Sequence, residues 1–354
     1  MAVGFGEHSD PQPLPENPSF THSEALASGA AVPFGQAFAD VSQDWFVSGS
    51  ARDPRLHSPV ENPKAEHPAS PPSRIPILGY LPPATPELMG DRQFTQQHRL
   101  RQPYVGGSMA NGIASVELVS ALAEAGNLAF YGAAGQTPEK VEQALSELER
   151  LQPGGSWGCN LIHSPSEPTI ESAVAQMLRQ RRVRHVEASA YIDLTEPLVK
   201  MRVQSLCRQA SGAVAPEISI MAKASRLEVA RKFLSPAPQE WLQRWLQQGE
   251  ISEEQAAWAK EWPICDDLTA EADSGGHTDN RPLSTLVPAF CELRTRLGKS
   301  LPKVNSVRIG AAGGLGSPAA ITAAFALGAG YVVIGSVHQS CLESGTSDVV
   351  RDHL

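Results

Sequence analysis

The segment Leu268-Thr-Ala-Glu-Ala-Asp-Ser-Gly-Gly-His277-Thr-Asp-Asn-Arg-Pro282 begins as a β-prone run and ends where a helical pattern starts. Between these lie two acids, two adjacent glycines and a histidine. Ligands collect at the carboxyl ends of strands in parallel α/β proteins, and Gly275-Gly276 would let the backbone approach a ligand closely. We therefore expect a functional site here. The alternative is an acidic surface turn whose histidine is solvated.

Strand-like and helix-like patterns alternate on both sides of this segment. Ser115 and Thr137 stand where N-caps belong, Gly126 follows the first helical run, and Ser225-Arg-Leu-Glu228 is typical of a capping box. Short apolar runs precede the helical runs and are expected as strands over residues 103–108, 128–131, 157–161, 183–189, 218–223, 264–271, 304–309 and 331–334. Eight strands alternating with helices predict an α/β fold, a TIM-type (β/α)8 barrel.

A helical insertion is expected at 234–263, after the fifth strand-helix unit. Two pairs of tryptophans at helical spacing flank a capping box, and they comprise Trp241, Trp245, Ser252-Glu-Glu-Gln255, Trp258 and Trp262. This pattern predicts a helical hairpin with a small aromatic core against the barrel. Because the hairpin runs directly into the segment with His277, we also hypothesise that it borders the entrance to the site.

The beginning of the chain differs from the rest. Residues 1–75 are rich in Pro, Ser, Ala and His and show little periodicity, which predicts an irregular Pro/Ser-rich extension or linker. A short apolar patch at Val32-Pro-Phe34 and Trp45-Phe-Val47 leaves docking onto the following domain open. Residues 76–354 are expected to form the barrel.

Composition excludes several classes of function. The formal net charge of −9 argues against a nucleic-acid partner, which requires a basic face. The five cysteines are widely spaced and lack a C-x-x-C pair, so they predict neither a disulfide framework nor a metal site. The first residues do not resemble a signal peptide, and no run of eighteen apolar residues occurs. We expect a cytoplasmic protein without a membrane span.

Glycines near the end of the chain indicate a phosphate site. Gly313-Gly314 and Gly335-Ser336 follow the expected seventh and eighth strands, where TIM barrels often hold a phosphate with backbone N–H groups. A Rossmann motif fits poorly, because the spacing is not G-x-G-x-x-G and no acid follows about 20 residues later. Glycines that only tighten turns are the remaining alternative.

Polar residues at other strand ends extend this site. Met109 and Asn111 follow the first strand, while Asn160 and Lys223 end the third and fifth. Each could have an ordinary role, Asn160 capping a turn and Lys223 pairing with an acid. Together with the glycines, an amide and a cation on one rim favour a flavin mononucleotide (FMN) pocket, where the lysine would stabilise the reduced flavin.

The chain resembles a known family over residues 79–351. It is similar to the enoyl reductase component of polyunsaturated fatty acid synthases and to trans-acting polyketide enoyl reductases, within the nitronate monooxygenase-like flavin barrels. The motifs that carry the resemblance are Gly79-Tyr-Leu-Pro-Pro, Gly107-Ser-Met-Ala-Asn-Gly-Ile-Ala-Ser115, Asn160-Leu-Ile-His-Ser-Pro-Ser-Glu-Pro168, Val186-Glu-Ala-Ser-Ala-Tyr191 and Ala270-Glu-Ala-Asp-Ser-Gly-Gly-His-Thr-Asp-Asn-Arg-Pro282. Members of the family usually continue further beyond the eighth strand than this chain does.

The resemblance implies an FMN-dependent reduction of 2-enoyl thioesters on an acyl carrier protein, acting in trans, with NADPH or NADH as reductant. Gly275, Gly276 and His277 would lie beside the flavin, with the histidine as proton donor or thioester orienter. Other synthase subunits would be partners, and a homodimer is left open. Two alternatives are a nitronate monooxygenase-type oxidase and an inactive, structural flavin-binding module.

Overall fold

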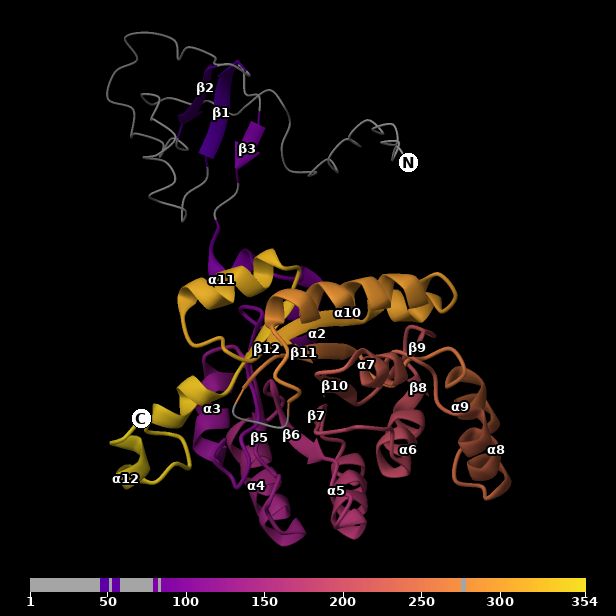
Figure 1. Cartoon of the computed structure of the whole chain (residues 1–354). Coiled ribbons are helices and arrows are strands. Elements are labelled where there is room, and N and C mark those ends of the chain that lie inside the picture. The colour runs from indigo at the N-terminus through magenta and orange to yellow at the C-terminus, as the bar shows by residue number, and fades with distance from the viewer. Residues whose placement is uncertain (1–44, 51–52, 58–78, 82–83, 275–277) are drawn as a thin grey trace. The chain divides into compact units, whose positions relative to one another are not determined.

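The computed structural model describes residues 45–50, 53–57, 79–81, 84–274 and 278–354 (Figure 1). The chain divides into two compact units, Met1–Thr85 and Pro86–Leu354.

Short strands form in the first unit, where the sequence predicts an irregular extension. The described residues include β1 (Trp45–Ser50), β2 (Asp53–His57) and β3 (Gly79–Leu81), which pair antiparallel in the order β2-β1-β3. Val47 lies opposite both Leu56 and Gly79, and Leu56 is buried. The expectation of irregular structure is thus wrong for 45–50 and 53–57, because strands this short show almost no periodicity in the sequence.

The second unit is a closed barrel, as predicted. In the described residues, eight strands, all pairing in parallel, close in the order β10-β11-β12-β13-β4-β5-β6-β7. Their bounds are β4 (Tyr104–Gly106), β5 (Leu128–Tyr131), β6 (Trp157–Ile162), β7 (His185–Ser189), β10 (Ser219–Ala224), β11 (Asp267–Glu271), β12 (Arg308–Ala312) and β13 (Tyr331–Ile334). Most positions in these strands are buried, as expected for parallel strands covered on the outside by helices.

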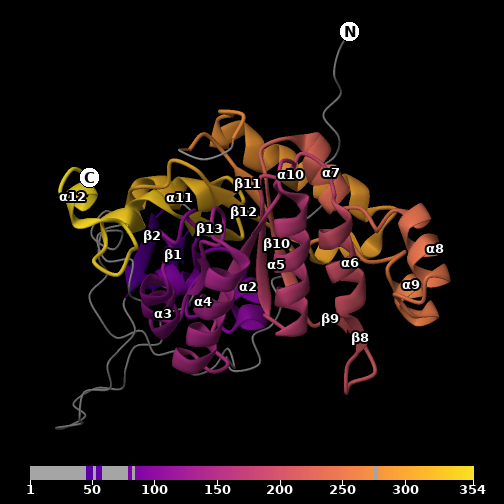
Figure 2. The ribbon, with the colours of Figure 1, turned by 90° about the horizontal axis from the view of Figure 1, so that it is seen from below.

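Helices connect these strands and surround them (Figure 2). They are α3 (Val116–Glu124), α4 (Pro138–Leu151), α5 (Pro168–Gln180), α6 (Glu196–Ser205), α7 (Leu227–Phe233), α10 (Leu283–Gly298) and α11 (Pro318–Ala326). The side chains of Ser115 and Thr137 accept hydrogen bonds from backbone N–H groups of the first turn, as their positions predict. After β13 come the 3-10 helix η3 (Ser336–Ser340) and α12 (Asp348–Arg351). No described helix is long and apolar enough to cross a membrane.

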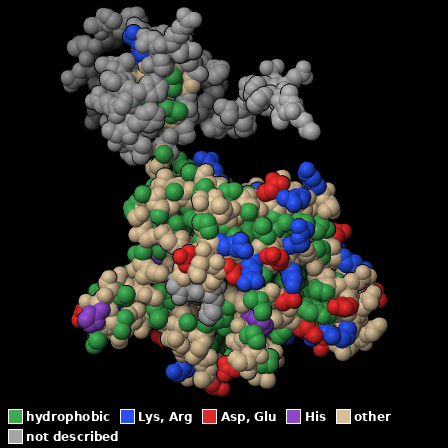
Figure 3. Space-filling model, in the orientation of Figure 1, with side chains coloured by type: hydrophobic (Ala, Val, Ile, Leu, Met, Phe, Trp, Pro, Cys, Tyr) green, Lys and Arg blue, Asp and Glu red, His purple; other side chains and the backbone are tan. Residues whose placement is uncertain are grey.

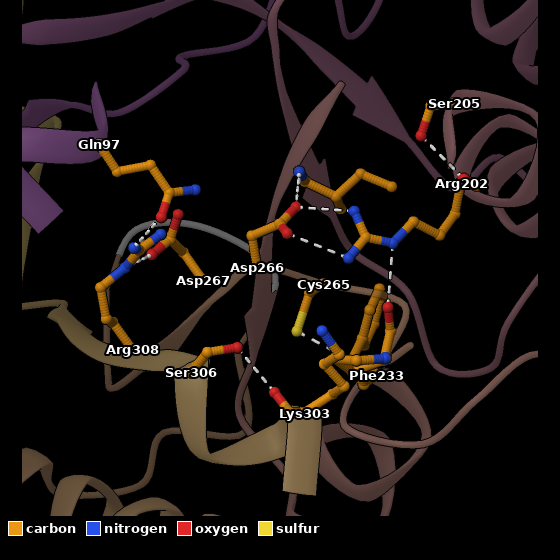
Figure 4. Close-up of polar contacts among 12 residues, drawn as sticks. Gln97, Arg202, Ser205, Phe233, Cys265, Asp266, Asp267, Lys303, Ser306 and Arg308 are labelled. Atoms are coloured by element: carbon orange, nitrogen blue, oxygen red, sulfur yellow. Dashed lines mark hydrogen bonds and ion pairs between the residues drawn. The ribbon is translucent and has the colours of Figure 1, made fainter. Parts of the chain in front are cut away.

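Another helix closes the barrel where its strands begin. The 3-10 turn η1 (Pro86–Leu88) leads into α2 (Arg92–His98), and the ring of Phe94 stacks on that of Tyr331 at 4.3 Å, inside the barrel core. His98 Nε2 lies 2.8 Å from Asp267 Oδ2. Asp267 also accepts a hydrogen bond of 2.6 Å from Arg308 Nε (Figure 4). Since Asp267 begins β11 and Arg308 begins β12, α2 covers the amino ends of these strands.

The seventh strand lies further along the chain than predicted. The sequence favours a strand at 304–309, whereas residues Pro302–Ser306 form the 3-10 helix η2 and β12 starts at Arg308. Pro302 occupies the first turn of η2. Gly310 belongs to β12 and not to the following loop. A Cβ at this position would lie 2.3 Å from the ring of Tyr331. The glycine therefore makes room for the tyrosine of the next strand.

Two helices, α8 (Gln239–Gln247) and α9 (Glu253–Trp258), occupy the segment between α7 and β11. The capping box at Ser252 is present, with hydrogen bonds in both directions between Ser252 and Gln255. Trp245 is fully buried, and the helices contact α6 and the hairpin of β8 (Leu206–Arg208) and β9 (Val214–Pro216). Figure 2 shows α8 and α9 together at one side of the barrel, beyond α6.

The surface carries charges of both signs. On the face shown in Figure 3, basic and acidic side chains are interspersed and do not separate into large areas of one sign. A protein that binds a phosphate backbone needs a continuous basic face, which this view does not show.

Candidate active site

A cavity of about 550 Å³ opens at the carboxyl ends of the barrel strands. Every strand of the barrel contributes to its lining, either with its last residues or with the loop that follows. The lining includes 107–110 after β4, Ala134 after β5, Asn160 and Ile162 on β6, Ser189 and Ala190 at the end of β7, Lys223 on β10, Glu271 and Ser274 at β11, 312–316 at β12 and 333–337 at β13. The volume lies within the usual range for small-molecule sites, roughly 300 to 1,000 Å³.

The structure brings most of the predicted site residues together around this cavity. Those that line it are Met109, Asn160, Lys223, Gly313, Gly314, Gly335 and Ser336. The predicted residues Gly275, Gly276 and His277 lie outside the described residues. Glu271 and Ser274, just before them, line the cavity.

Asn111 does not line the cavity, in contrast to the prediction. Its backbone is in the left-handed region, with φ of 58°, and its side chain is exposed. The Asn111 N–H donates to the carbonyl of Ala134. Its Oδ1 packs against Gly135, where an added Cβ would lie only 2.3 Å from this oxygen. The residue therefore supports the turn between two loops, which is the common role of an asparagine with positive φ.

The glycines after β12 and β13 form a polar end of the cavity. Gly313 has φ of 94°, and a Cβ there would lie 2.7 Å from the carbonyl oxygen of Ala272. Among the described hydrogen bonds, the backbone N–H groups of Gly314, Gly335 and Ser336 donate to no backbone carbonyl. With the amino end of α11 close behind in the chain, this arrangement suits an anion such as a phosphate.

Lys223 lies on the floor of the cavity between two carboxylates. Its Nζ is 2.9 Å from Glu271 Oε1 and 4.0 Å from Glu187 Oε1. Burial lowers the pKa of Lys223, but the two carboxylates outweigh burial and hold this pKa above its ordinary value. The lysine is therefore charged. It pairs with an acid, as one alternative from the sequence predicted, and it also lines the cavity.

Glu187 is a buried carboxyl behind this lysine. Its side chain is fully buried, and Oε2 accepts from the N–H of Ser108 at 3.3 Å and from the Ser108 hydroxyl. The Asn160 amide donates to the Glu187 carbonyl at 3.2 Å and to the Ser189 hydroxyl at 2.9 Å. Asn160 therefore joins β6 to β7 and does not cap a turn.

Glu187 and Glu271 belong to the site but were not predicted from the sequence. One pattern in the sequence could have indicated them: each is an acid within a short strand of mostly apolar or small residues. An acid buried in such a strand usually has a partner. Both residues fall inside quoted motifs, but their type alone did not show that they meet at Lys223.

The loop after β11 is fixed to the loop after β10. Asp279 Oδ2 accepts from the Ser225 hydroxyl at 2.7 Å, and the Arg226 guanidinium donates to both carboxylate oxygens at 2.5 and 2.7 Å. Hydrogen bonds from Arg226 and Ser225 lower the pKa of Asp279 to about 2. The capping box predicted at Ser225 is absent: α7 begins without a side-chain cap because this hydroxyl binds Asp279.

The helical pair α8 and α9 lies away from the cavity, which corrects the hypothesis that it borders the entrance. None of the lining residues comes from 234–263. Lys200 of α6 binds Glu250 at 2.6 Å, and Lys303 of η2 lies 4.5 Å over the ring of Trp262. A segment that follows a helix and precedes a strand joins the barrel where the strands begin, opposite the ligand face.

Fold and site together define a TIM-barrel protein with a small-molecule cavity at the carboxyl ends of its strands. Comparison with solved structures finds the enoyl reductase domain of MlnA, from the macrolactin biosynthesis cluster of Bacillus amyloliquefaciens, with a TM-score of 0.72 and 36% identity over 75% of this chain and 60% of that chain. A mutant FabK from Thermotoga maritima, at 21% identity and a TM-score of 0.50, covers 73% of this chain and 70% of that one and shares the fold.

Curated proteins give the same result. The chain is 40% identical over 274 residues to one of the polyunsaturated fatty acid synthase subunits of Thraustochytrium, and 39% identical over 271 residues to the polyketide biosynthesis protein PksE of Bacillus subtilis. These alignments cover 77% and 76% of this chain but only 18% and 35% of the relatives. No protein-family model matches. The resemblance inferred from the motifs is confirmed: the chain is homologous to an enoyl reductase domain and to proteins of polyunsaturated fatty acid and polyketide synthesis.

Proposed function

We propose that this chain is an FMN-dependent enoyl reductase. It would act in trans on 2-enoyl thioesters carried by an acyl carrier protein, with NADPH or NADH as reductant, alongside other subunits of a polyunsaturated fatty acid or polyketide synthase. The observation that carries the proposal is a single cavity that combines a glycine-lined anion site after β12 and β13 with the buried ammonium of Lys223. The 36% identity to an enoyl reductase domain supports the choice of reaction.

The described residues fit FMN. Gly313, Gly314, Gly335 and Ser336 would hold its phosphate through backbone N–H groups, and the cavity volume of about 550 Å³ suits a ligand of this size. Bound FMN would supply hydride transfer to the β-carbon of the enoyl group.

The protein's own side chains would provide charge and protons. Lys223 would place a fixed positive charge at the cavity floor, where it favours negative charge that develops on a bound ligand. His277 would protonate the α-carbon or orient the thioester carbonyl, a role that follows from the resemblance. Hydrogen bonds from Ser225 and Arg226 fix Asp279, which is two residues after this histidine in the chain.

The proposal is tested with the purified full-length protein. We expect a visible flavin spectrum, release of FMN on denaturation, and NAD(P)H-dependent reduction of an enoyl thioester on an acyl carrier protein. Retention of FAD or NAD in place of FMN, or of no cofactor after reconstitution, contradicts the cofactor assignment. Aerobic consumption of nitronates without enoyl reduction identifies the oxidase alternative, and bound FMN without either reaction identifies a structural module.

A further inference from the structure

We infer that Glu187 holds a proton in the resting protein and thereby sets the net charge of the cavity floor around Lys223. The residue acts by position and charge and need not touch a substrate. The consequence for a bound flavin rests on the proposed function, whereas the protonation itself does not.

The hydrogen bonds of Glu187 are unevenly distributed between its two carboxyl oxygens. Oε2 accepts from the backbone N–H and hydroxyl of Ser108, and the Ser189 hydroxyl lies 3.5 Å from it. Oε1 is buried and, in the described part of the chain, accepts no hydrogen bond; the Lys223 ammonium faces it at 4.0 Å, too far for one. Burying an ionised carboxylate with one oxygen that accepts no hydrogen bond costs much more free energy than burying a neutral carboxyl.

Lys223 cannot neutralise two carboxylates. Its ammonium makes a direct contact of 2.9 Å with Glu271, and it lies 4.0 Å from Glu187. Two carboxyl groups that share one cation repel each other when both are charged, so one of them takes up a proton. The proton goes to Glu187, because its side chain is 0% exposed while that of Glu271 is 13% exposed and contacts the lysine directly.

The other groups around Glu187 support the same charge state. Burial raises the pKa of Glu187, with Glu271 adding to this effect and Lys223 and Ser108 opposing it. Cys159, on the neighbouring strand β6, is also fully buried, and burial raises the pKa of its thiol, so it adds no charge. Ser108 and Ser189 carry no charge. The charged set that faces Glu187 is therefore Lys223 and Glu271.

This arrangement gives the floor two charge states. With Glu187 protonated, one ammonium faces one carboxylate and the floor is neutral. When Glu187 loses its proton to solvent at higher pH, the floor carries a net negative charge. A negative floor disfavours the reduced, anionic form of a bound flavin, so its midpoint potential should fall more steeply with pH once Glu187 ionises.

The first test uses the protein without cofactor. Infrared difference spectroscopy on Glu187→Gln against wild type at neutral pH should show loss of one protonated-carboxyl C=O band. The control Glu171→Gln, which removes another buried acidic side chain outside the cavity lining, should keep that band. Ser108→Ala removes a donor that favours the ionised form, so the band should persist to higher pH. Absence of the band from wild type overturns the inference.

The second test measures the flavin midpoint potential against pH. Wild type should show the additional slope at alkaline pH, and Glu187→Gln should lack it while matching wild type at neutral pH. A raised potential of Glu187→Gln at neutral pH would mean that Glu187 is ionised in wild type and would overturn the inference. If no preparation binds flavin, the proposed function fails, and the infrared experiment still decides the protonation of Glu187. Should Glu187→Gln not fold, Ser108→Ala carries both measurements.

Discussion

A buried polar network joins α2 to the first residues of β11 and β12. Asp267 lies 2.8 Å from His98. It accepts from Arg308 at 2.6 Å, and Arg308 also donates to Gln97 at 2.6 Å (Figure 4). Burial raises the pKa of Asp267, but Arg308 and His98 outweigh it and bring this pKa down to about 2. Asp267 is therefore ionised and paired, so it helps fix α2 across the amino end of the barrel.

His185, close to this network, should make the fold sensitive to acid. Burial, followed by the neighbouring His98, lowers the pKa of His185 to about 3. The unfolded chain binds a proton on this group below about 6.5 and the folded protein does not, so stability falls as pH drops from about 6.5 towards 3. This one group contributes a slope of about 1.4 kcal/mol per pH unit. The Asp267 carboxylate adds to the loss only at lower pH, below its ordinary value of 3.8.

The measurement is the free energy of unfolding in urea between pH 7 and 5. His185→Gln keeps a donor for the Trp157 carbonyl, 3.2 Å from His185 Nδ1 in the native protein, and should flatten the profile. His353→Gln, at the exposed end of the chain, is the control and should leave the profile unchanged. Equal profiles for wild type and His185→Gln would remove His185 as the cause.

A second residue-scale prediction concerns His277. In His277→Ala, FMN content and flavin reduction by NAD(P)H should largely persist, because the proposed phosphate and floor contacts come from other residues. Reoxidation of the pre-reduced protein by an enoyl thioester should slow by about a hundredfold or more, the usual effect of losing a positioned acid. Stopped-flow absorbance measures both half-reactions. Reoxidation at the wild-type rate would leave His277 with a structural role only.

Individual site residues were predictable where residue type restricts function. Glycines after the last two strands and Lys223 at a strand end are unusual enough to indicate the cavity. Asn111 and Glu187 were not, because the fate of an amide or carboxylate depends on which groups the fold brings near it. Asn111 faces Gly135, 24 positions away by residue number, whereas Glu187 meets Ser108 across the barrel, and neither contact has a local pattern.

At the scale of elements, local signals placed the helices well and the caps at Ser115, Thr137 and Ser252, but the capping box predicted at Ser225 is absent. The sequence could not place η2 and β12. A glycine usually indicates a loop, but Gly310 lies within β12 because the ring of Tyr331 on the neighbouring strand leaves no room for a side chain. It also identified α8 and α9 but put them at the wrong end of the barrel. The prediction was wrong because it placed the pair next to the carboxyl end of β11. A segment that precedes a strand lies at the amino end of that strand.

The position of α8 and α9 predicts a purely structural role for their tryptophans. Trp245→Ala removes a fully buried ring and should lower the free energy of unfolding by about 3 to 5 kcal/mol. The neighbouring Leu246→Ala, at a side chain that is 37% exposed, should change it by about 0.5 kcal/mol or less. Flavin content per folded protein should match wild type in both variants. Loss of flavin from folded Trp245→Ala would show that the pair supports the cavity after all.

At the scale of the whole chain, the described residues of the cavity belong to the barrel unit. The described residues that line the cavity, and the three apolar clusters of the core, all belong to Pro86–Leu354. The first unit has its own strand pairing and its own buried residue, Leu56. Comparison with relatives fits this division, since about three quarters of the chain aligns with them.

Residues 86–354 alone should therefore fold and bind FMN. Met1–Thr85 provides no described residue to the cavity, so we expect flavin content and affinity within about twofold of the full chain, which corresponds to less than about 0.5 kcal/mol. Fluorescence titration of FMN into both proteins, after removal of bound flavin, gives the comparison, and circular dichroism reports whether each is folded. A matched truncation that starts at Arg99 also removes α2. It should expose the part of the barrel core that Phe94 covers and should fail to fold. If the 86–354 protein is folded but binds FMN tenfold more weakly, the first unit contributes to the site and the division proposed here is wrong.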